Sequence, residues 1–384
     1  MFKKKAEGYL STKESRRISR ENRKITNELE KKRKRRNVPE SEYVTRMKDE
    51  QNVLEIDNLH TYFFTDAGTV KSVNGVSFDV PVGKTVGVVG ESGCGKSVTS
   101  LSIMQLVQRP QGQTVEGEIR LNLGEGKAIN IVNTPNEKMQ TIRGNYVSMI
   151  FQEPMTSLNP VFRIGAQVDE VIALHHPEMN KEAVKARTIE MLKLVGIANS
   201  EGVYRMYPHE LSGGMRQRVV IAMGLACNPK LIIADEPTTA LDVTIQAQIL
   251  DLLRELKDKI NSSIMLITHD LGVIAEMADY VVVMYAGRVV EKGTAAEIFK
   301  NPCHPYTIGL MNSKPVVGKK VERLYSIPGK VPNPVDMPQY CYFKDRCEMC
   351  VEACKGAYPG VVQLSDTHFV SCYRHMDMNK EGGK

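Results

Sequence analysis

The chain has 384 residues, of which 42% are hydrophobic and 25% are charged, and its formal net charge is +6. This length allows two or three domains with a sizeable core, and the balanced composition excludes global disorder and collagen-like repeats. No apolar run approaches the roughly 18–20 residues that span a bilayer, and the charged start of the chain lacks the apolar stretch of a secretory signal. We therefore expect a protein of the cytosol or of the inner side of a membrane.

Residues 1–52 form a basic segment that we predict to be a flexible N-terminal arm. Residues 1–50 hold 17 Lys and Arg against 9 Asp and Glu, a net charge of +8, which leaves the other 334 residues with 34 basic and 36 acidic side chains. The few apolar residues of the arm bury too little surface for independent folding. We expect at most a frayed polar helix that ends near the basic run 31–36.

Three interpretations of this arm are open. It is a solvated tail, a contact for anionic lipid headgroups, or a sequence-blind contact for nucleic acid. Because aromatic residues are nearly absent from the arm, no platform for base stacking supports the third interpretation. We therefore expect no nucleic-acid partner, and of the two binding interpretations we prefer the lipid contact.

Residues 53–300 alternate short apolar runs with amphipathic segments, which predicts an α/β domain. Four runs have the length and composition of buried strands: Thr85–Val89, Leu231–Ala234, Ile264–Thr268 and Tyr280–Met284. Helices are expected at Val98–Val107, Val168–Leu174, Lys181–Val195 and around Ile245–Leu256. Residues 301–384 are richer in Pro, Gly and Cys, so we predict a loop-rich C-terminal region.

A glycine-rich motif follows the first predicted strand. Gly90–Ser97 reads G-E-S-G-C-G-K-S and precedes a predicted helix, which is the context of a phosphate-binding P-loop. Its glycines allow consecutive backbone N–H groups to turn toward a phosphate at the helix N-terminus. Lys96 can neutralise the β- and γ-oxygens, and the Ser97 hydroxyl can ligate Mg²⁺. The motif therefore predicts binding of ATP with Mg²⁺.

An acidic pair ends the second predicted strand. Asp235 and Glu236 follow the apolar run Leu231–Ala234. Asp235 can hold the coordination shell of Mg²⁺, and Glu236 can polarise an attacking water. The two motifs together predict an ATPase.

Four more motifs occur in the order found in ATP-binding-cassette (ABC) ATPases, and the chain resembles that family over about residues 53–300. Leu211-Ser-Gly-Gly-Met215 resembles the signature motif and Gln152 the Q-loop, while Ala240-Leu241-Asp242 resembles the D-loop and His269 the switch histidine. Phe63, or its neighbour Tyr62, stands where the family stacks an aromatic ring on adenine.

The resemblance implies an ABC-type P-loop NTPase fold with an antiparallel β subdomain and a helical subdomain at about residues 153–225. It implies that Glu236, His269, Gln152 and Lys96 act in catalysis, and that Ser97, Gln152 and Asp235 surround Mg²⁺. In the family, the signature motif binds the ATP of a partner subunit, so we expect a dimer. The implied nucleotide contacts are Gly90, Glu91, Ser92, Gly93, Cys94, Gly95, Lys96, Ser97, Val98, Phe63, Ser212, Gly213, Gly214 and Asp242.

Two separate segments resemble the oligopeptide/dipeptide/nickel uptake subfamily. They are Glu153-Pro-Met-Thr-Ser-Leu-Asn-Pro160 after the Q-loop and Asn301-Pro-Cys-His-Pro-Tyr-Thr307, which the run 324–332 follows. The resemblance implies the ATP-hydrolysing subunit of a membrane importer for oligopeptides or dipeptides, peripheral on the cytoplasmic face of the cell membrane. An importer for nickel or another small solute is the alternative. A soluble ABC protein acting on ribosomes or nucleic acid is disfavoured, because the chain has one cassette and no long coiled-coil insertion.

The resemblance also implies partners. They are two transmembrane permease subunits, a second ABC ATPase subunit and, indirectly, an extracellular or periplasmic solute-binding protein. The subfamily usually pairs two different ATPases, so we expect a heterodimer, with a homodimer as the alternative.

Five of the eight cysteines lie within the last 44 residues. Cys341, Cys347, Cys354 and Cys372 resemble the four-cysteine pattern of peptide-importer ATPases, which implies a [4Fe–4S] cluster. Four thiolates suit either iron–sulfur or zinc, and spacing alone does not distinguish these two from a site without metal. Cys350 is a fifth candidate ligand. Elsewhere, Cys94 in the phosphate loop is a candidate oxidation-sensitive position.

Overall fold

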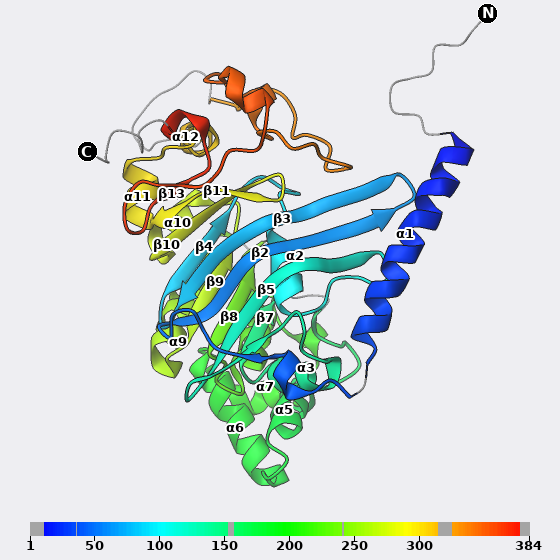
Figure 1. The fold of residues 1–384 in the computed structure, drawn as a ribbon. Coiled ribbons are helices and arrows are strands. Elements are labelled where there is room, and N and C mark those ends of the chain that lie inside the picture. The colour runs from blue at the N-terminus through cyan, green and yellow to red at the C-terminus, as the bar shows by residue number, and fades with distance from the viewer. Residues whose placement is uncertain (1–10, 36, 153–156, 240–241, 314–324, 377–384) are drawn as a thin grey trace, which may run out of the picture.

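The computed structural model describes residues 11–35, 37–152, 157–239, 242–313 and 325–376, which form two β-sheets and the helices around them (Figure 1). None of the helices in these ranges combines the length and the apolar character that a bilayer crossing needs. The strands are β1 (Val44–Thr45), β2 (Asn52–Thr65), β3 (Gly68–Pro81), β4 (Thr85–Val89), β5 (Gly112–Gly124), β6 (Lys127–Asn130), β7 (Val147–Ile150), β8 (Leu231–Asp235), β9 (Ser263–Ile267), β10 (Tyr280–Tyr285), β11 (Arg288–Thr294), β12 (Val362–Gln363) and β13 (Phe369–Val370).

The helices lie mainly between and after these strands. They are α1 (Thr12–Arg33), α2 (Lys96–Ile103), α3 (Asn136–Ile142), α5 (Ile164–His175), α6 (Lys181–Leu194), α7 (Ser200–Arg205), α8 (Gly213–Leu225), α9 (Val243–Ile260), α10 (Leu271–Met277), α11 (Ala295–Lys300) and α12 (Pro305–Asn312). The predicted helix Val98–Val107 begins two residues earlier and ends sooner, because Gln105 has a left-handed backbone (φ 51°).

The larger sheet has the strand order β12-β13-β11-β10-β4-β9-β8-β7. Strands β10, β4, β9, β8 and β7 are parallel, and β11 and β13 extend the sheet in antiparallel pairing. Every residue of β4, β8 and β9 is buried, which explains why these strands are continuous apolar runs in the sequence. The four strands predicted from such runs are confirmed. The carboxyl ends of the parallel strands meet at one edge, where ligand sites of such sheets form.

The smaller sheet is antiparallel, with the order β1-β6-β5-β2-β3. Its inner face packs on the larger sheet, so that Leu54 and Phe78 share one apolar cluster with Val88, Ile233 and Met265. A second apolar cluster joins the other side of the larger sheet to helices α5 to α9. Strand β1 pairs with β6, so the antiparallel sheet already includes residues before the predicted boundary at 52/53.

Helix α1 lies across the ends of strands in the smaller sheet (Figure 1). A capping box between Ser11 and Glu14 starts the helix. The Asn22 amide donates a hydrogen bond to the Thr65 carbonyl (2.8 Å), and Gln113 of β5 donates one to Glu30 (2.8 Å). Where the composition suggested a frayed helix, residues 12–33 form a helix that packs through polar contacts. The expectation of a frayed helix depended on the low apolar content of the segment, and apolar content gives no information about polar contacts.

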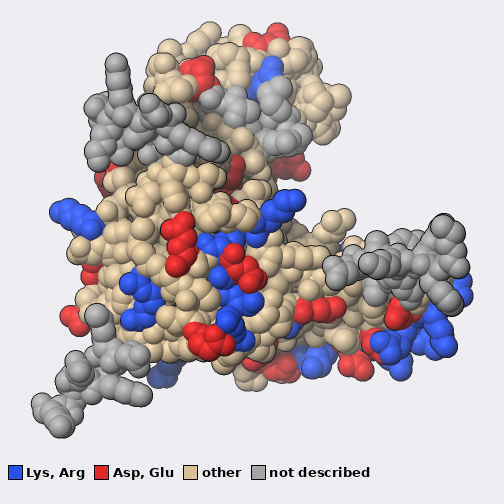
Figure 2. Space-filling model, turned by 90° about the horizontal axis from the view of Figure 1, so that it is seen from above, with Lys and Arg blue, Asp and Glu red and all other residues tan. Residues whose placement is uncertain are grey.

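Residues 325–376 contain short 3-10 turns and the two-residue strands β12 and β13, as expected for a loop-rich region. Strand β13 pairs with β11, and Val335 forms a bridge with Val70 of β3. The region therefore contacts both sheets. On the face seen in Figure 2, basic and acidic side chains are interspersed over the body of the molecule and form no continuous patch of one sign.

Candidate nucleotide-binding site

The phosphate loop Gly90–Ser97 connects β4 to α2 at the carboxyl edge of the parallel strands. Gly90 and Gly95 have φ values of 154° and 102°, and Gly95 is the N-cap of α2. A Cβ at Gly90 would lie 2.2 Å from the Met284 carbonyl oxygen, and one at Gly95 would lie 2.3 Å from that of Ser72. Only glycine fits these two positions, so the loop can present its backbone N–H groups at the start of a helix.

Lys96 is buried inside this loop, with 6% of its surface exposed. Its ammonium donates hydrogen bonds to the carbonyl oxygens of Gly90 (2.7 Å) and Glu91 (3.1 Å). The backbone of the loop thus holds the positive charge where a phosphate would bind.

Cys94 is also buried in the loop (1% exposed), and burial raises the pKa of its thiol. Both features disfavour the thiolate that oxidants attack, which weakens the interpretation of Cys94 as oxidation-sensitive.

Ser97 and Asp235 approach each other from α2 and β8. The Ser97 hydroxyl donates to Asp235 Oδ1 (3.1 Å), and the Ser100 hydroxyl donates to Oδ2 (3.4 Å). Burial raises the pKa of Asp235, although the hydrogen bond from Ser97 opposes this effect. Among the described residues, the side chains that donate hydrogen bonds to this buried carboxylate are the hydroxyls of Ser97 and Ser100. Hydroxyl and carboxylate oxygens are the ligands that Mg²⁺ prefers. The residues present therefore fit a Mg²⁺ site.

Three predicted residues from three separate loops meet at one carboxylate. Gln152 Nε2 donates to Glu236 Oε2 (3.0 Å), and His269 Nδ1 lies 3.3 Å from Oε1. Gln152 follows β7, Glu236 follows β8 and His269 follows β9, so the parallel pairing of neighbouring strands brings them together. The Glu236 side chain is 17% exposed and that of His269 is 69% exposed. Water can therefore reach this group from the histidine side.

Thr239 also contacts this carboxylate and was not predicted from the motifs. Its hydroxyl donates to Glu236 Oε2 (2.9 Å). The signal was its position three residues after the acid, in a turn where the Thr239 N–H donates to the Glu236 carbonyl.

The signature and D-loop residues lie at the starts of two other helices. Ser212 is the N-cap of α8 and accepts a hydrogen bond from the Met215 N–H (3.4 Å), while Asp242 caps α9 through the Ile245 N–H (2.9 Å). A Cβ added at Gly213 would meet no atom within 4 Å, so the N-terminus of α8 has open space. In the described part of this chain, no hydrogen bond or ion pair joins Ser212–Gly214 to the phosphate loop. Ala240-Leu241 and Glu153–Thr156 lie outside the described residues.

Of the two aromatic candidates for adenine stacking, Phe63 is the one free of polar partners among the described contacts. The Tyr62 hydroxyl donates to Asn74 (2.8 Å) and lies 2.9 Å from His60 Nδ1. A Cβ at Gly112 would lie 2.8 Å from the Phe63 ring. Phe63 thus packs beside Gly112, and its ring, unlike that of Tyr62, has no polar group that needs a hydrogen-bond partner.

The four predicted cysteine ligands lie in one region. Cys341, Cys354 and Cys372 are buried and Cys347 is half-buried, whereas Cys350 is exposed. Burial raises the pKa of Cys341 to about 12, and repulsion among the thiolates adds to this effect for Cys341, Cys347 and Cys372. Among the described residues, however, no three of these sulfur atoms lie within 4.8 Å of one another.

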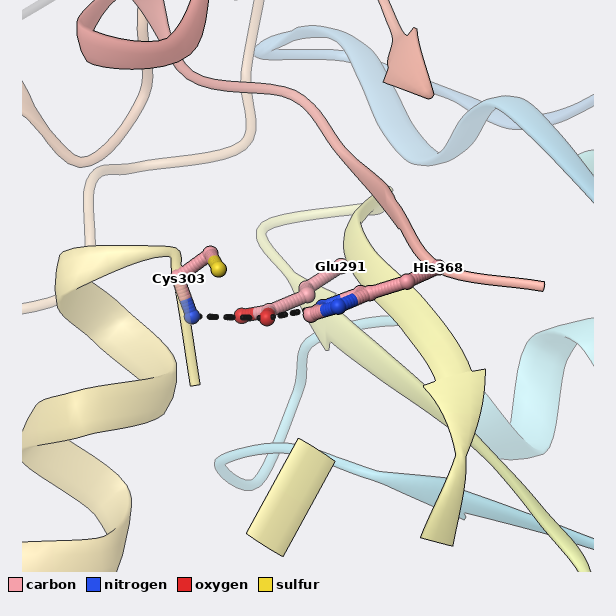
Figure 3. Close-up of side chains that lie close together, drawn as sticks. All are labelled: Glu291, Cys303 and His368. Carbon is pink, nitrogen blue, oxygen red and sulfur yellow. Dashed lines mark hydrogen bonds and ion pairs between the residues drawn. The ribbon is translucent and has the colours of Figure 1, made fainter. Parts of the chain in front are cut away.

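Within the described residues, a different trio meets that distance: Glu291, Cys303 and His368 (Figure 3). His368 Nε2 lies 2.8 Å from Glu291 Oε1, which also accepts from the Cys303 N–H (2.8 Å). The His304 N–H donates to Oε2 (2.9 Å). Because the protein itself already satisfies both carboxylate oxygens, we interpret this trio as a buried hydrogen-bond network that holds the C-terminal region on β11.

Two family models match the chain. The ABC transporter model matches residues 73–239, and the model of the oligopeptide/dipeptide transporter C-terminal region matches residues 290–354. The oligopeptide transport ATP-binding protein AppD of Bacillus subtilis is 50% identical over 329 residues, covering 86% of this chain and 98% of the relative. The dipeptide transport ATP-binding protein DppD of the same organism is 48% identical over 323 residues, covering 84% and 95%.

A solved structure adds a likeness in three dimensions. It is the dimeric structure of an ATP-binding cassette in a post-hydrolysis state, bound to ADP and Pi. That cassette is 25% identical, has a TM-score of 0.55, and the match covers 63% of this chain and 98% of that chain.

Proposed function

Because the chain belongs to the oligopeptide/dipeptide transporter family of ABC ATPases, we propose that Glu236 is the general base of its ATP hydrolysis, with Gln152 and His269 as partners. The ABC cassette fold predicted from the motifs is confirmed. The chain is the ATP-binding subunit of an oligopeptide or dipeptide ABC importer, and its hydrolysis of ATP powers the transport. The observation that carries the catalytic proposal is the meeting of Gln152 and His269 at the Glu236 carboxylate.

The proposed chemistry follows from where these groups lie. Glu236 accepts the proton of the attacking water, which reaches it from the exposed side at His269. Gln152 and His269 orient the water and the γ-phosphate, and Lys96 stabilises the negative charge that develops on the phosphate oxygens. Ser97, Asp235 and Gln152 would hold Mg²⁺, and the bound ion would supply positive charge to neutralise the β- and γ-phosphates.

A complete site requires a second ATPase subunit. The chain has one phosphate loop and one signature motif, and as an ABC ATPase of a peptide importer it dimerises and works with membrane permease subunits. We propose that Ser212, Gly213 and Gly214 bind the γ-phosphate held by the partner subunit, with the open N-terminus of α8 as the anion site. Asp242 caps α9 at the same interface. We propose a heterodimer as the assembly, with a homodimer as the alternative.

Substrate class and location complete the proposal. Both of the named relatives are peptide transport proteins, which supports peptides over nickel as the solute. We propose that the subunit is peripheral on the cytoplasmic face of the membrane, that a solute-binding protein delivers the peptide, and that exposed basic residues of α1 contact anionic lipid. We propose the division into an arm (1–52), an ATPase domain (53–300, with a helical part at about 153–225) and a C-terminal region (301–384). In the ATP site, Gly90–Val98 and Phe63 are the proposed nucleotide contacts.

For the cysteine-rich region we propose a [4Fe–4S] cluster held by Cys341, Cys347, Cys354 and Cys372. A single zinc ion with four Zn–S bonds of about 2.3 Å needs sulfur atoms about 3.8 Å apart. In the part of the chain that the structure describes, no three of these sulfur atoms lie within 4.8 Å of one another. A cluster that places several iron and sulfide ions between the thiolates suits wider spacing. The exposure of Cys350 supports its exclusion from the ligand set.

The catalytic proposal is tested by Glu236→Gln in the assembled transporter. Loss of the general base is expected to lower the rate of ATP hydrolysis by about 10²-fold or more, while binding of ATP persists. Hydrolysis is measured as phosphate release from proteoliposomes supplied with peptide. Glu255→Gln, which changes an exposed glutamate on α9, is the matched control and keeps full activity. Near-normal hydrolysis in Glu236→Gln would refute the assignment.

A further inference from the structure

One arginine of the cysteine-rich region reaches the phosphate loop. Arg346 Nη1 and Nη2 donate to the two carboxylate oxygens of Glu91 at 2.7 and 3.0 Å, across 255 positions of sequence. Paired N–H groups on a carboxylate fix both the distance and the orientation of the partner. The Arg346 side chain is only 6% exposed, so water screens this pair weakly.

The surroundings of Arg346 hold the guanidinium in one place. Its Nε donates to the Pro328 carbonyl (2.9 Å), and Nη1 lies 3.3 Å from the Tyr285 hydroxyl. The guanidinium lies over the rings of Tyr285 and Phe343, at 5.7 and 5.9 Å from their centroids. A side chain with this many fixed partners is a rigid support for Glu91.

Glu91 in turn is held at its backbone. The Glu91 N–H donates to the Tyr306 hydroxyl (2.8 Å), and Tyr306 packs against Tyr285 and Phe343 in the same aromatic group. The Glu91 carbonyl accepts from Lys96 Nζ (3.1 Å). A continuous set of contacts therefore leads from Arg346 and Tyr306 through Glu91 to the lysine that neutralises phosphate charge.

Arg346 is also tied to the cysteines. It lies in the 3-10 turn η3 (Lys344–Arg346), directly before Cys347. The Cys341 carbonyl accepts from the Lys344 N–H (3.1 Å), and the Cys347 N–H donates to the Lys344 carbonyl (3.4 Å). The turn that carries Arg346 is therefore hydrogen-bonded to the backbone of both cysteines.

We propose that Arg346 is a positioning residue for the phosphate loop, and that it couples the state of the cysteine-rich region to nucleotide affinity. This inference rests on the proposed nucleotide site and adds that the cysteine-rich region regulates the affinity of that site for nucleotide. Arg346 contacts neither phosphate nor water in this role. It acts through Glu91 and the loop backbone, so that loss of the pair loosens the loop and weakens phosphate binding.

Calorimetric titration of the full-length chain with Mg²⁺ and ADP tests the first half of the proposal. ADP fills the phosphate loop without turnover, so affinity is separated from catalysis. Arg346→Ala is expected to raise the Kd at least fivefold, and Arg346→Lys, which keeps the charge without the paired geometry, to lie between it and wild type. Glu91→Gln is expected to weaken binding too, and the double variant to be no worse than Arg346→Ala alone. Lys355→Ala removes an exposed charge of the same region and leaves the Kd unchanged.

Different results would contradict the positioning role of Arg346 and the nucleotide site itself. If Arg346→Ala lowers the melting temperature but binds ADP as wild type does, the residue is structural only. If wild type itself binds no ADP, the proposed nucleotide site fails instead. In ATP hydrolysis, a positioning role predicts that KM rises more than kcat falls.

The coupling to the cysteines has its own test. Cys347→Ser is expected to raise the Kd for Mg²⁺ and ADP in the wild-type background, and to have no further effect in the Arg346→Ala background. Cys350→Ser, at the exposed cysteine, is the matched control. An unchanged Kd in Cys347→Ser, or full additivity with Arg346→Ala, would overturn the coupling.

Discussion

At the scale of single residues, Glu236, the proposed general base, has a strained backbone conformation. Its φ of 48° is in the left-handed region, which is unfavourable for a residue with a Cβ by an amount on the order of 1–3 kcal/mol. The Glu236 N–H donates to the Ile267 carbonyl of β9 (2.8 Å), which supports this conformation. The turn directs the carboxylate toward Gln152 and His269. The hydrogen bond to β9 thus maintains a strained conformation that holds the Glu236 carboxylate in one orientation, as the proposed catalytic role requires.

Thr239 provides a residue-scale prediction. Its hydroxyl donates to the same Glu236 oxygen as Gln152. Thr239→Val preserves the shape of the side chain but removes one hydrogen bond, a loss of about 1 kcal/mol in orienting energy. We expect kcat for ATP hydrolysis to fall about fivefold, with KM for ATP nearly unchanged.

The measurement is steady-state phosphate release by the assembled transporter. Thr239→Ser keeps the hydroxyl and is expected to restore most of the wild-type rate. If Thr239→Val keeps the wild-type kcat, the hydrogen bond from Thr239 does not orient Glu236.

The residues around the phosphate loop and Glu236 show which side chains of the site the sequence could predict. Lys96, Asp235 and Glu236 were predicted from residue type and from strand ends, because parallel strands bring their carboxyl ends together. Thr239 and Arg346 were missed. The signal for Thr239 was only its position three residues after Glu236, and the contact of Arg346 with Glu91 depends on how the C-terminal region folds back.

At the scale of elements, the short strands β12 and β13 depend on helix α11. Glu297 of α11 accepts from the Ser365 hydroxyl (2.6 Å) and from the Thr367 hydroxyl (2.8 Å), both in the turn between the strands. It also accepts from the Thr294 N–H and hydroxyl in a capping box. Burial alone would raise the pKa of Glu297, but these hydrogen bonds outweigh it and lower the pKa from 4.5 to about 2.

A pH dependence follows from this direction. A carboxyl group whose pKa is lowered by folding stabilises the folded state above its unfolded pKa, and this contribution is lost as the pH falls toward its folded pKa. The stabilisation by Glu297 is therefore complete above about pH 4.5 and decreases between about pH 4.5 and 2. We expect Glu297→Gln to weaken the protection of residues 362–370 against hydrogen exchange at pH 7, by about tenfold for a loss near 1.4 kcal/mol.

The difference in hydrogen-exchange protection between wild type and Glu297→Gln is expected to decrease as the pH falls from about 4.5 to 2. Hydrogen exchange followed by mass spectrometry, corrected for intrinsic rates, measures it at several pH values. Glu255→Gln on α9 serves as control. Equal protection of wild type and Glu297→Gln at pH 7 would show that the hydrogen bonds of Glu297 do not hold the strands.

The sequence predicted the strands that are completely buried, but it did not predict how the helix that is held by polar contacts packs. The apolar runs of β4, β8, β9 and β10 located the parallel strands to within a residue or two, since a strand buried on both faces has no polar positions. Helix α1 has only three apolar residues, Ile18, Ile25 and Leu29, and the buried positions of its docked face are the polar residues Asn22 and Thr26. A pattern of hydrophobicity could not predict that face, because the contacts that hold it are hydrogen bonds.

At the scale of the whole molecule, the charge is divided between α1 and the body. The body balances acid and base, and the phosphate loop supplies its own positive charge through Lys96 and backbone N–H groups. The side of α1 that faces the sheet includes the buried, uncharged Asn22 and Thr26 and the Glu30 carboxylate. The exposed acidic residues of the helix are Glu14, Glu21 and Glu28, and they are outnumbered by exposed basic residues: Lys13, Arg16, Arg17, Arg20, Arg23, Lys24, Lys31 and Lys32. Docking of α1 therefore orients the positive charge outward in a fixed direction.

This fixed orientation leads to a prediction about membranes. Each Lys close to an anionic bilayer contributes up to about 1 kcal/mol of attraction. Lys24→Gln with Lys31→Gln is therefore expected to weaken binding of the full-length chain to vesicles of phosphatidylglycerol and phosphatidylethanolamine by roughly tenfold to thirtyfold. Cosedimentation measures the binding, and because the attraction is electrostatic, about 0.5 M salt is expected to abolish it.

The control places the same change of charge elsewhere. Lys193→Gln with Lys300→Gln removes two exposed lysines from α6 and α11, and this variant is expected to bind vesicles as wild type does. Equal loss in both double variants would mean that net charge alone drives the attraction. Binding to neutral phosphatidylcholine vesicles with similar affinity would refute the electrostatic contact. Only a loss specific to α1 supports a membrane-facing role, because the docked helix differs from a flexible tail in directing its charge to one side of the molecule.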